Sequence, residues 1–449
     1  MDILIALRKL HELRSNARLS RSDFEAHKLR KFRTLVAHAY QHSPFYRQLI
    51  DDRRIDIANC SVSDFPVLTK TILMQNFDQL VTDRKITKQA VAEFLTRSTD
   101  PNDLFLNRYH VLHTSGSSGE VGYFLFSSQD WTRSMAQSMR RRSSAPRPAR
   151  RRRGRIRVAF YGAIGGHFAG VSMASGATRG IARFAVNLGL YEVNDPLPKV
   201  VARLNEFQPE MISGYTTALK ILAQKQREGS LHIAPAGIGT GGEAMTAADQ
   251  QELSDAFKCP VYGSYACTEH LLMGACIDGK TITLYDDDLI YEFYDDHSVV
   301  TNLFNFTLPL IRYRMSDILR PLPHSDQPPY LQIESLVGRA ERLPAFLNRD
   351  GVRDFVSPHT INEIFVAGVT RFQMQLLGDT HFRFRICLDQ SLNREQQSQA
   401  VAGVGRRLRE ILDQKLMTNV TFEVVVVDDI PINARTRKFQ LIVDQREAP

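Results

Sequence analysis

The sequence predicts an α/β protein, with a large N-terminal domain of β-sheets flanked by helices and a smaller α+β domain after it. From residue 156 onward, short β-rich runs alternate with helical stretches, and glycine-rich turns follow the runs. This order is typical of parallel βαβ units. Beyond residue 340, β-rich runs surround one long helical stretch at 393–416. Because 449 residues exceed one ordinary core, we expect a first domain over residues 1–339 and a second over 340–449.

The elements follow one another in a regular order. Residues 1–50 place apolar side chains at helical spacing, Thr69 is suited to cap a helix, and a helix is expected from residue 128. Helices are also expected at 196–207, 217–228 and 246–257. Strands are expected near 123–126, 158–161, 210–215, 236–243 and 259–265, and then at 289–294, 299–304, 310–314, 330–333, 371–377, 381–388 and 420–427.

Composition indicates a soluble globular protein. Hydrophobic residues make up 43% and charged residues 24% of the chain, and no apolar run approaches the roughly 18–20 residues of a membrane span. We see no secretory signal. The five cysteines are scattered and odd in number, which favours a reducing compartment over a disulfide framework. We therefore expect a cytoplasmic protein.

The net charge of +8 is concentrated in one run, with ten arginines between residues 140 and 157. Such a run can attract a polyphosphate ligand, a membrane surface or nucleic acid, and it can equally be a solvated loop. Aromatic residues are absent between Met135 and Val158, so the stacking partners of a single-strand binder are missing. Nucleic acid is the least favoured of these partners.

The most prominent local feature is a glycine–serine loop, His113 followed by Thr-Ser-Gly-Ser-Ser-Gly-Glu-Val-Gly at 114–122. Backbone N–H groups and hydroxyls in such a loop form a concave anion site that suits phosphate. It is not a Walker P-loop, because the Gly-Lys-Ser/Thr ending is missing. An ordinary surface turn is the alternative.

Four further polar clusters follow predicted strands, where ligands gather in parallel sheets. Each has a plainer interpretation as well: Glu243 as an acidic residue at a helix start, Thr268 and Glu269 as a helix cap, Arg314 and Asp317 as a surface ion pair. The clusters are 241–246 (Gly-Gly-Glu-Ala-Met-Thr), 265–269 (Tyr-Ala-Cys-Thr-Glu), 312–317 (Arg-Tyr-Arg-Met-Ser-Asp) and 338–339 (Gly-Arg).

In order and spacing, these five motifs resemble those of the adenylate-forming superfamily of acyl- and aryl-CoA synthetases, luciferases and adenylation domains. The resemblance covers nearly the whole chain. Residues 42–46 (His-Ser-Pro-Phe-Tyr) and 65–70 (Phe-Pro-Val-Leu-Thr-Lys) are similar to the N-terminus of the phenylacetate–coenzyme A ligase branch. The resemblance implies ATP and Mg2+ as cofactors, and a small C-terminal domain that is mobile.

The resemblance also implies roles for individual residues. Asp317 would accept the ribose hydroxyls, Glu269 would coordinate Mg2+, and Thr268 would contact the α-phosphate. The β- and γ-phosphates would be held by Thr114, Ser115, Gly116, Ser117, Ser118 and Gly119. The adenine would be flanked by Gly242, Glu243 and Tyr265, and the ribose or phosphate contacted by Arg339.

In this superfamily a lysine of the C-terminal domain reaches the α-phosphate, and the candidate here is Lys438. Arg437 replaces the usual preceding glycine, so Arg435 is a rival cation, and an exposed lysine in a basic turn is the plain alternative. The loop also lacks its usual Pro-Lys ending, for which the arginine run is a possible substitute. The hinge motif after Arg339 is altered as well, so Asp350 and Gly351 are an alternative flexible point.

The acyl-acid side is less defined. His167 falls where relatives place an aromatic residue or histidine beside the substrate carboxylate, although a structural histidine is equally consistent. Tyr161 and Gly241 are the other substrate candidates. Cys259, Cys267, His270 and Cys276 lie close together in sequence, but their spacing matches no tight zinc pattern.

The combined prediction is an AMP-forming acid–thiol ligase. It would activate a carboxylic acid as an acyl or aryl adenylate and pass the acyl group to a thiol, most simply coenzyme A. One alternative delivers the adenylate to an amine, a carrier protein or a cofactor. Another is a catalytically silent nucleotide-binding protein with a basic interaction segment. The sequence does not identify the acid.

Overall fold

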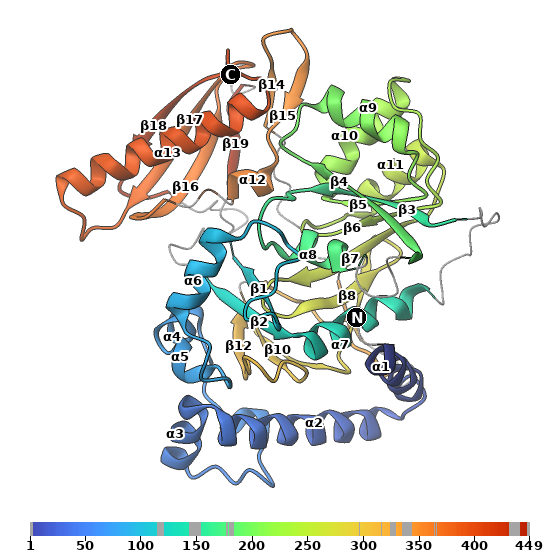
Figure 1. Cartoon of the computed structure of the whole chain (residues 1–449), viewed down its shortest axis with the longest axis vertical. Coiled ribbons are helices and arrows are strands. Elements are labelled where there is room, and N and C mark those ends of the chain that lie inside the picture. Colours follow the sequence, from blue (N-terminus) through green and yellow to red (C-terminus); the bar gives the residue numbers. More distant parts are fainter. Residues whose placement is uncertain are drawn as a thin grey trace.

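The computed structural model describes residues 3–114, 121–142, 154–176, 178, 184–295, 297–315, 317–323, 329–334, 344–362, 364, 366–430 and 441–446. Helices surround multi-stranded sheets in the larger part of the molecule, and a C-terminal α+β unit lies beside it (Figure 1). The predicted α/β class is therefore confirmed. The predicted domain boundary at residue 339 lies outside the described residues.

An eight-stranded sheet forms the centre of the larger part, with strand order β13-β9-β8-β7-β6-β5-β3-β4. Strands β4, β3, β5, β6 and β7 run parallel to one another, whereas β8, β9 and β13 continue the sheet in antiparallel fashion. The strands are β3 (Ile156–Gly162), β4 (Val186–Glu192), β5 (Met211–Gly214), β6 (Gly237–Thr240), β7 (Val261–Cys267), β8 (Leu271–Cys276), β9 (Thr281–Leu284) and β13 (Gln332–Glu334).

Helices connect the parallel strands, as predicted for βαβ units. They are α8 (Ala169–Gly176), α9 (Leu197–Phe207), α10 (Thr216–Arg227) and α11 (Ala247–Phe257). Helix α11 begins with its own capping box, in which Thr246 and Asp249 bond each other's backbone N–H groups. Helices α9 and α10 have no such bond from their own N-cap side chains. Their first N–H groups need partners from elsewhere in the chain.

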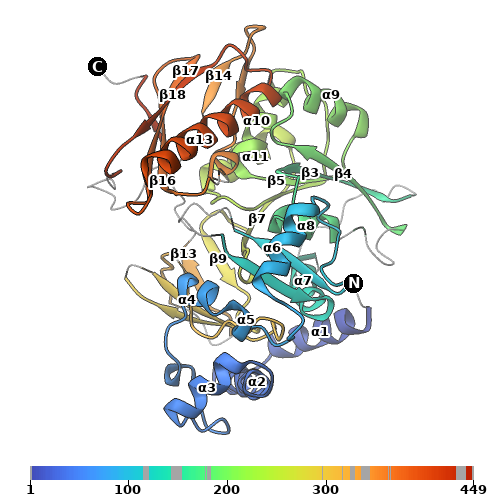
Figure 2. The same ribbon diagram turned by 60° about the vertical axis from the view of Figure 1, so that its left-hand side comes forward.

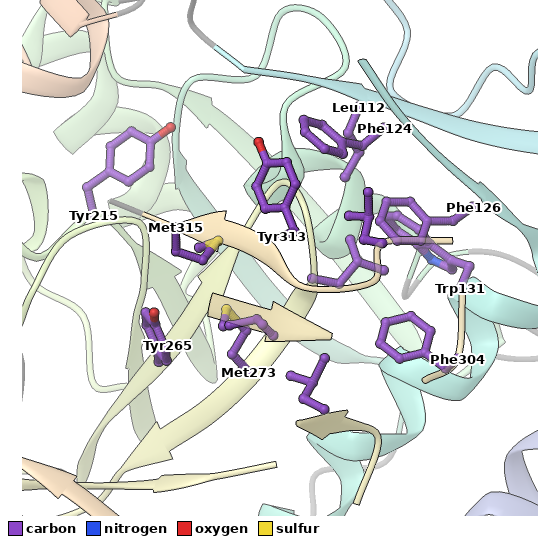
Figure 3. Packing of buried hydrophobic residues seen from close by; sticks show 14 of the residues in the cluster. Leu112, Phe124, Phe126, Trp131, Tyr215, Tyr265, Met273, Phe304, Tyr313 and Met315 are labelled. Atoms are coloured by element: carbon purple, nitrogen blue, oxygen red, sulfur yellow. The ribbon is translucent and has the colours of Figure 1, made fainter. Parts of the chain in front are cut away.

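A hairpin and a small sheet pack beside the eight strands. The glycine–serine loop joins the two antiparallel strands β1 (Tyr109–His113) and β2 (Tyr123–Ser127), and α7 (Ser128–Arg142) follows. Strands β10 (Leu289–Phe293), β11 (Ser298–Asn302) and β12 (Tyr313–Met315) form a three-stranded antiparallel sheet. Figure 3 shows how the buried side chains of these elements meet those of β7 and β8, among them Phe124, Phe126, Tyr265, Met273, Tyr313 and Met315.

The N-terminal part of the chain is helical, as predicted, and Figure 1 shows α2 along the lower side of the molecule. Helix α4 begins after Thr69, whose hydroxyl accepts the backbone N–H of Ile72 at 3.3 Å, which confirms the predicted cap. None of the described helices is both long and apolar enough to cross a bilayer. The helices are α1 (Ile3–Asn16), α2 (Arg21–His42), α3 (Pro44–Arg53), α4 (Lys70–Gln75), α5 (Phe77–Leu80) and α6 (Lys88–Arg97), with a 3-10 turn at Val62–Asp64.

Helices α1 and α2 are attached to the sheets through three consecutive buried aspartates, Asp286, Asp287 and Asp288. Lys9 of α1 lies 2.7 Å from the Asp288 carboxylate, and Lys31 of α2 also pairs with it. Although burial raises the pKa of Asp288, these ammonium groups hold it well below its usual range. Buried charges need such partners, so the network fixes where both helices sit.

The C-terminal unit has a core of its own. A four-stranded sheet of order β18-β17-β16-β19 packs against the long helix α13 (Figure 2). A hairpin of β14 and β15 and the short helix α12 precede it. The elements are β14 (Ala345–Leu347), β15 (Arg353–Phe355), α12 (Pro358–Asn362), β16 (Val369–Leu376), β17 (His381–Leu388), α13 (Arg394–Gln414), β18 (Thr421–Val426) and β19 (Ile442–Asp444).

Asp286 generates a stability prediction. Burial raises the pKa of this carboxyl from 3.8 to about 6, even though Lys28 and Arg21 lie near it. The folded protein therefore binds a proton that the unfolded chain releases between these values. The contribution of Asp286 to the free energy of unfolding should fall as the pH rises from about 4 to 6, by up to about 1.4 kcal/mol per pH unit.

Urea unfolding of wild type and Asp286→Asn across this pH range measures the effect. The difference in unfolding free energy, wild type minus variant, should decrease as the pH rises. A difference that stays flat or increases would contradict the assignment.

Candidate functional site

The turns that follow the parallel strands meet at one edge of the eight-stranded sheet, as ligand-binding turns do in such folds. His167 follows β3, Gly241 and Gly242 follow β6, and Glu269 follows β7. The backbone N–H of Gly241 bonds the carbonyl of Gly214 at the end of β5, at 3.1 Å. The structure thus brings four strand ends together, and most of the described candidate residues lie on them.

The base of the glycine–serine loop is well defined. The backbone N–H of Thr114 bonds the carbonyl of Gly122 at 3.0 Å, and the Thr114 hydroxyl accepts the Gly122 N–H at 2.9 Å. These two hydrogen bonds close the hairpin at the point where the loop begins and ends. The remaining loop candidates, together with Arg339 and Lys438, lie outside the described residues: Ser115, Gly116, Ser117, Ser118 and Gly119.

Lys70 also lies beside this loop base, and it was not among the predicted site residues. Its Cε atom is 3.1 Å from the position that a Cβ atom on Gly122 would occupy. Lys70 reaches this place because the preceding Leu68 pairs with β12: its N–H bonds the Arg312 carbonyl and its carbonyl accepts the Arg314 N–H, each at 2.9 Å. The available signal was the 65–70 motif, whose lysine had no assigned role.

Glu269 is half-buried in the turn between β7 and β8, together with Thr268. Burial raises the pKa of its carboxyl, the positive charge of Lys70 opposes that rise, and the negative charge of Asp317 adds to it. The charges of Lys70 and Asp317 are therefore both close enough to act on Glu269. A carboxylate that is costly to ionise alone is suited to a cationic partner.

Tyr265 and Asp317 are joined directly. The phenolic hydroxyl of Tyr265 donates to the Asp317 carboxylate at 2.8 Å, across 52 residues of sequence. Burial and the neighbouring Asp317 raise the pKa of the Tyr265 phenol well above its usual range. The phenol therefore stays protonated, remains a donor, and orients one carboxylate oxygen of Asp317.

On the predicted adenine side, Gly242 and Glu243 have distinct structural roles. Gly242 adopts φ +76°, and a Cβ there would lie 3.0 Å from the ring of Tyr215, so both conformation and space require glycine. The Glu243 carboxylate accepts the Thr217 N–H at 2.8 Å and its hydroxyl at 2.9 Å. Glu243 thereby caps α10, which lacks a cap of its own.

The candidates for the acyl acid differ in their surroundings. His167 is buried, with its ring against Phe94 and its Nε2 atom 3.1 Å from the Ser98 hydroxyl. His113, at the end of β1, is half-buried and packs against Phe168 with ring centroids 4.7 Å apart. Tyr161 is fully buried, and its hydroxyl has no hydrogen-bond partner among the described residues.

The arginine run and the group of cysteines remain to be placed. Arg155 and Arg157 end the arginine run at the start of β3, about 20 Å along that strand from the turns described above. Arg157 is engaged there by the Gln208 carbonyl at 2.7 Å. Among the described residues, which include all five cysteines and His270, no three potential ligands are grouped as a metal site.

No protein-family model matches the chain. Protein CapK of Staphylococcus aureus is 21% identical over 340 residues, which cover 69% of this chain and 66% of CapK. The match thus spans about two thirds of that relative's length. Phenylacetate-coenzyme A ligase of Escherichia coli (strain K12) is 24% identical over 379 residues, which cover 75% of this chain and 78% of the relative.

The solved structures that match the chain include those of an acyl-CoA ligase. The 2-hydroxyisobutyryl-CoA ligase in complex with 2-HIB-AMP and CoA, in the thioesterification state, matches with a TM-score of 0.59 and 17% identity over 96% of this chain and 91% of that chain. The same ligase in the postadenylation state with R3-HIB-AMP gives a TM-score of 0.52 and 18% identity over 94% and 89%. The chain thus has the fold of these ligases, and its predicted resemblance to the adenylate-forming superfamily, with a phenylacetate–coenzyme A ligase-like branch, is confirmed.

Proposed function

We propose that this protein activates a carboxylic acid with ATP and transfers the acyl group to a thiol, most simply coenzyme A. The observation that carries the proposal is that Lys70 lies beside the base of the glycine–serine loop and that its charge, with that of Asp317, acts on the Glu269 carboxyl. The names of the relatives support it, because one is an acid–coenzyme A ligase and the matched ligase structures hold acyl-AMP and CoA.

The reaction has two balanced steps. A carboxylate oxygen of the acid attacks the α-phosphorus of ATP, the bond to the β-phosphate oxygen breaks, and pyrophosphate leaves. The thiol then loses its proton to solvent and its sulfur attacks the acyl carbon of the adenylate, the bond between that carbon and the phosphate oxygen breaks, and AMP leaves. Negative charge grows on pyrophosphate in the first step, so cations and oriented donors near that group lower its barrier.

The nucleotide half of the site would use the Tyr265–Asp317 pair. The Asp317 carboxylate would accept the ribose hydroxyls, and the Tyr265 hydroxyl orients that carboxylate. Gly242 lets the Tyr215 ring pack directly against the turn after β6, which would hold that turn in place beside the base. Because the Glu243 carboxylate caps α10, we propose that its contribution to the adenine side comes through the backbone of the turn.

Glu269 is the candidate ligand for Mg2+. A raised pKa in a half-buried turn fits a carboxylate whose ionised form requires a cation, and Mg2+ commonly takes one or two carboxylates and completes its shell with phosphate oxygens and water. A bound Mg2+ would neutralise charge on the phosphates. Thr268, in the same turn, would contact the α-phosphate.

Lys70 would supply the cation on the pyrophosphate side that the loop sequence lacks. Its neighbours Gly122 and Glu269 would put its ammonium group between the loop and the carboxylate. The described end of the arginine run is held at the far end of β3, so Lys70 is the better substitute. Lys438 of the C-terminal unit would reach the α-phosphate from the other side, with Arg435 as its rival.

The function is tested by a pyrophosphate-release screen over carboxylic acids, with and without coenzyme A. We expect release with at least one acid and coenzyme A consumption at the same rate. Asp317→Ala and Glu269→Ala should each lower release by about 100-fold or more without unfolding the protein. Near-normal release in either variant would contradict these roles.

The same assays separate the alternatives. Lys438→Ala should slow adenylation far more than thioester formation from a supplied adenylate. Acid-dependent pyrophosphate release without coenzyme A consumption would instead favour an amine, carrier-protein or cofactor acceptor.

Lys70 generates an independent prediction. Lys70→Ala should lower pyrophosphate release by about tenfold or more, because developing charge on pyrophosphate loses its nearby cation. Lys70→Arg should retain part of the activity. The exposed Lys85 provides the matched control, and Lys85→Ala should leave the rate unchanged. Equal rates for wild type and Lys70→Ala would exclude Lys70 from the site.

The raised pKa of Glu269 predicts a pH-dependent metal requirement. Protons and Mg2+ compete for the carboxylate, so lowering the pH should weaken Mg2+ binding, beginning at a higher pH than for an ordinary glutamate. The free Mg2+ concentration that gives half-maximal pyrophosphate release, at constant MgATP, should rise as the pH is lowered. A requirement that stays constant down to the ordinary range of glutamate would disprove the assignment.

A further inference from the structure

A buried ion pair lies where the C-terminal unit meets the larger part of the molecule. Lys415, just after α13, is 3.1 Å from the Asp354 carboxylate in β15, and both side chains are essentially inaccessible to solvent. The Lys415 ammonium also donates to the backbone carbonyl of Asp195, 3.1 Å away. Burying two charges costs desolvation free energy, so this pair stabilises the contact between the two units less than its short distance suggests.

Asp354 also completes a helix of the other unit. Its second carboxylate oxygen accepts the backbone N–H of Leu197, the first residue of α9, at 3.0 Å. The N-cap position of α9 is Pro196, which offers no capping side chain. A carboxylate at a helix N-terminus satisfies an orphan N–H and complements the helix dipole, so α9 is capped across the junction.

A third contact completes the junction: the Thr360 hydroxyl of α12 donates to the Asn194 side-chain oxygen at 2.9 Å. Asp354, Thr360 and Lys415 thus all bind residues 192–197, the segment between β4 and α9. We call these three residues and that segment the clasp. The β14–β15 hairpin itself is tied to the C-terminal sheet, because Arg446 bonds the Ala345 carbonyl at 3.0 Å and Asn419 the Leu347 carbonyl at 2.9 Å.

The same segment is bonded to the turn that follows β3. The Glu192 carboxylate accepts the backbone N–H of Ile164 at 3.0 Å and that of Asn194 at 3.0 Å. Val193 N–H bonds the Gly162 carbonyl at 2.9 Å. Residues 162–168 include the acyl-acid candidate His167, so one short segment touches the C-terminal unit on one side and the acyl-acid turn on the other.

We propose that the clasp is a positioning device for the proposed reaction, which holds one arrangement of the two units and opens when the C-terminal unit moves between the half-reactions. This rests on the proposed function, in which Lys438 of that unit serves adenylation, and on the mobility that the resemblance to the superfamily implies for the unit. Closing the clasp orders residues 192–197 and, through Glu192, the acyl-acid turn. The clasp residues act through this turn and do not touch the reacting atoms.

The first test removes the charges together. In the double variant Asp354→Asn, Lys415→Met, no unpaired buried charge remains, so the protein should still fold. We expect the ratio of two rates, pyrophosphate release and thioester formation from a supplied adenylate, to change by about fivefold or more. Arg353→Met is the matched control, because Arg353 forms an exposed pair with Asp379 within the C-terminal unit. Equal changes in both rates would overturn the proposal.

The second test closes the clasp covalently. Asn194→Cys and Thr360→Cys replace a hydrogen-bonded pair, so oxidation or a short thiol crosslinker should join them. The crosslinked protein should lose multiple-turnover thioester formation by about tenfold or more, and cleavage of the disulfide should restore it. The parent protein treated identically controls for its five native cysteines, four of which are buried.

The outcomes separate the two levels of the argument. Normal turnover by the crosslinked protein would refute the clasp alone and leave the proposed function standing. Absence of pyrophosphate release with every acid in the reduced and parent proteins would refute the proposed function, and the clasp with it.

Discussion

The short strand β12 fixes the relative positions of most of the candidate site. Leu68 bonds the backbone on both sides of Tyr313, which brings Lys70 to the site. The Tyr313 ring makes edge contacts with Phe124 in the loop hairpin and with His270 next to Glu269, at 6.0 and 5.9 Å. Asp317 follows two residues after the strand ends. Four pieces of the site therefore depend on one three-residue strand.

The residue just before β12, Arg312, has a backbone conformation that is unfavourable for its residue type. Arg312 adopts φ +53°, a region that non-glycine residues rarely occupy. Its guanidinium is held by Glu292 at 2.7 and 2.9 Å and by the Phe65 carbonyl at 2.7 Å, and its N–H by the Thr301 hydroxyl. These bonds offset the backbone cost, which is of order 1 kcal/mol or more. They also hold the Arg312 guanidinium on Glu292 and the Phe65 carbonyl.

Much of the fold could be predicted because its signals are local. Helix caps such as Thr69, the glycine turns and the alternation of strands and helices are written in consecutive residues. Strands β8 and β9 were not predicted, since Leu271–Cys276 is buried at every position and a continuous apolar run has no strand period. The turn at Thr268 and Glu269 joins two antiparallel strands, so the alternative of a helix cap there was wrong.

The parts of the site that could not be predicted depend on pairings between distant segments. The Tyr265–Asp317 bond requires the sheet that contains β7 and the sheet that contains β12 to lie next to each other. The place of Lys70 requires the bridge from Leu68 to Tyr313. The cap that Glu243 gives to α10 likewise depends on the packing of two turns. Residue types suggested which side chains matter, but only the packing decides which of them meet.

The aspartates at 286–288 determine when, during synthesis of the chain, helices α1 and α2 can be held in place. Lys9 and Asp288 are separated by 279 residues, so the ribosome releases α1 and α2 long before their anionic partners exist. During that interval the apolar face of α2 lacks partners that are made later, such as Tyr330, whose ring centroid lies 5.6 Å from that of Phe24. Exposed apolar surface of this kind favours aggregation and chaperone binding. Helices α1 and α2 are thus made well before the residues that secure them.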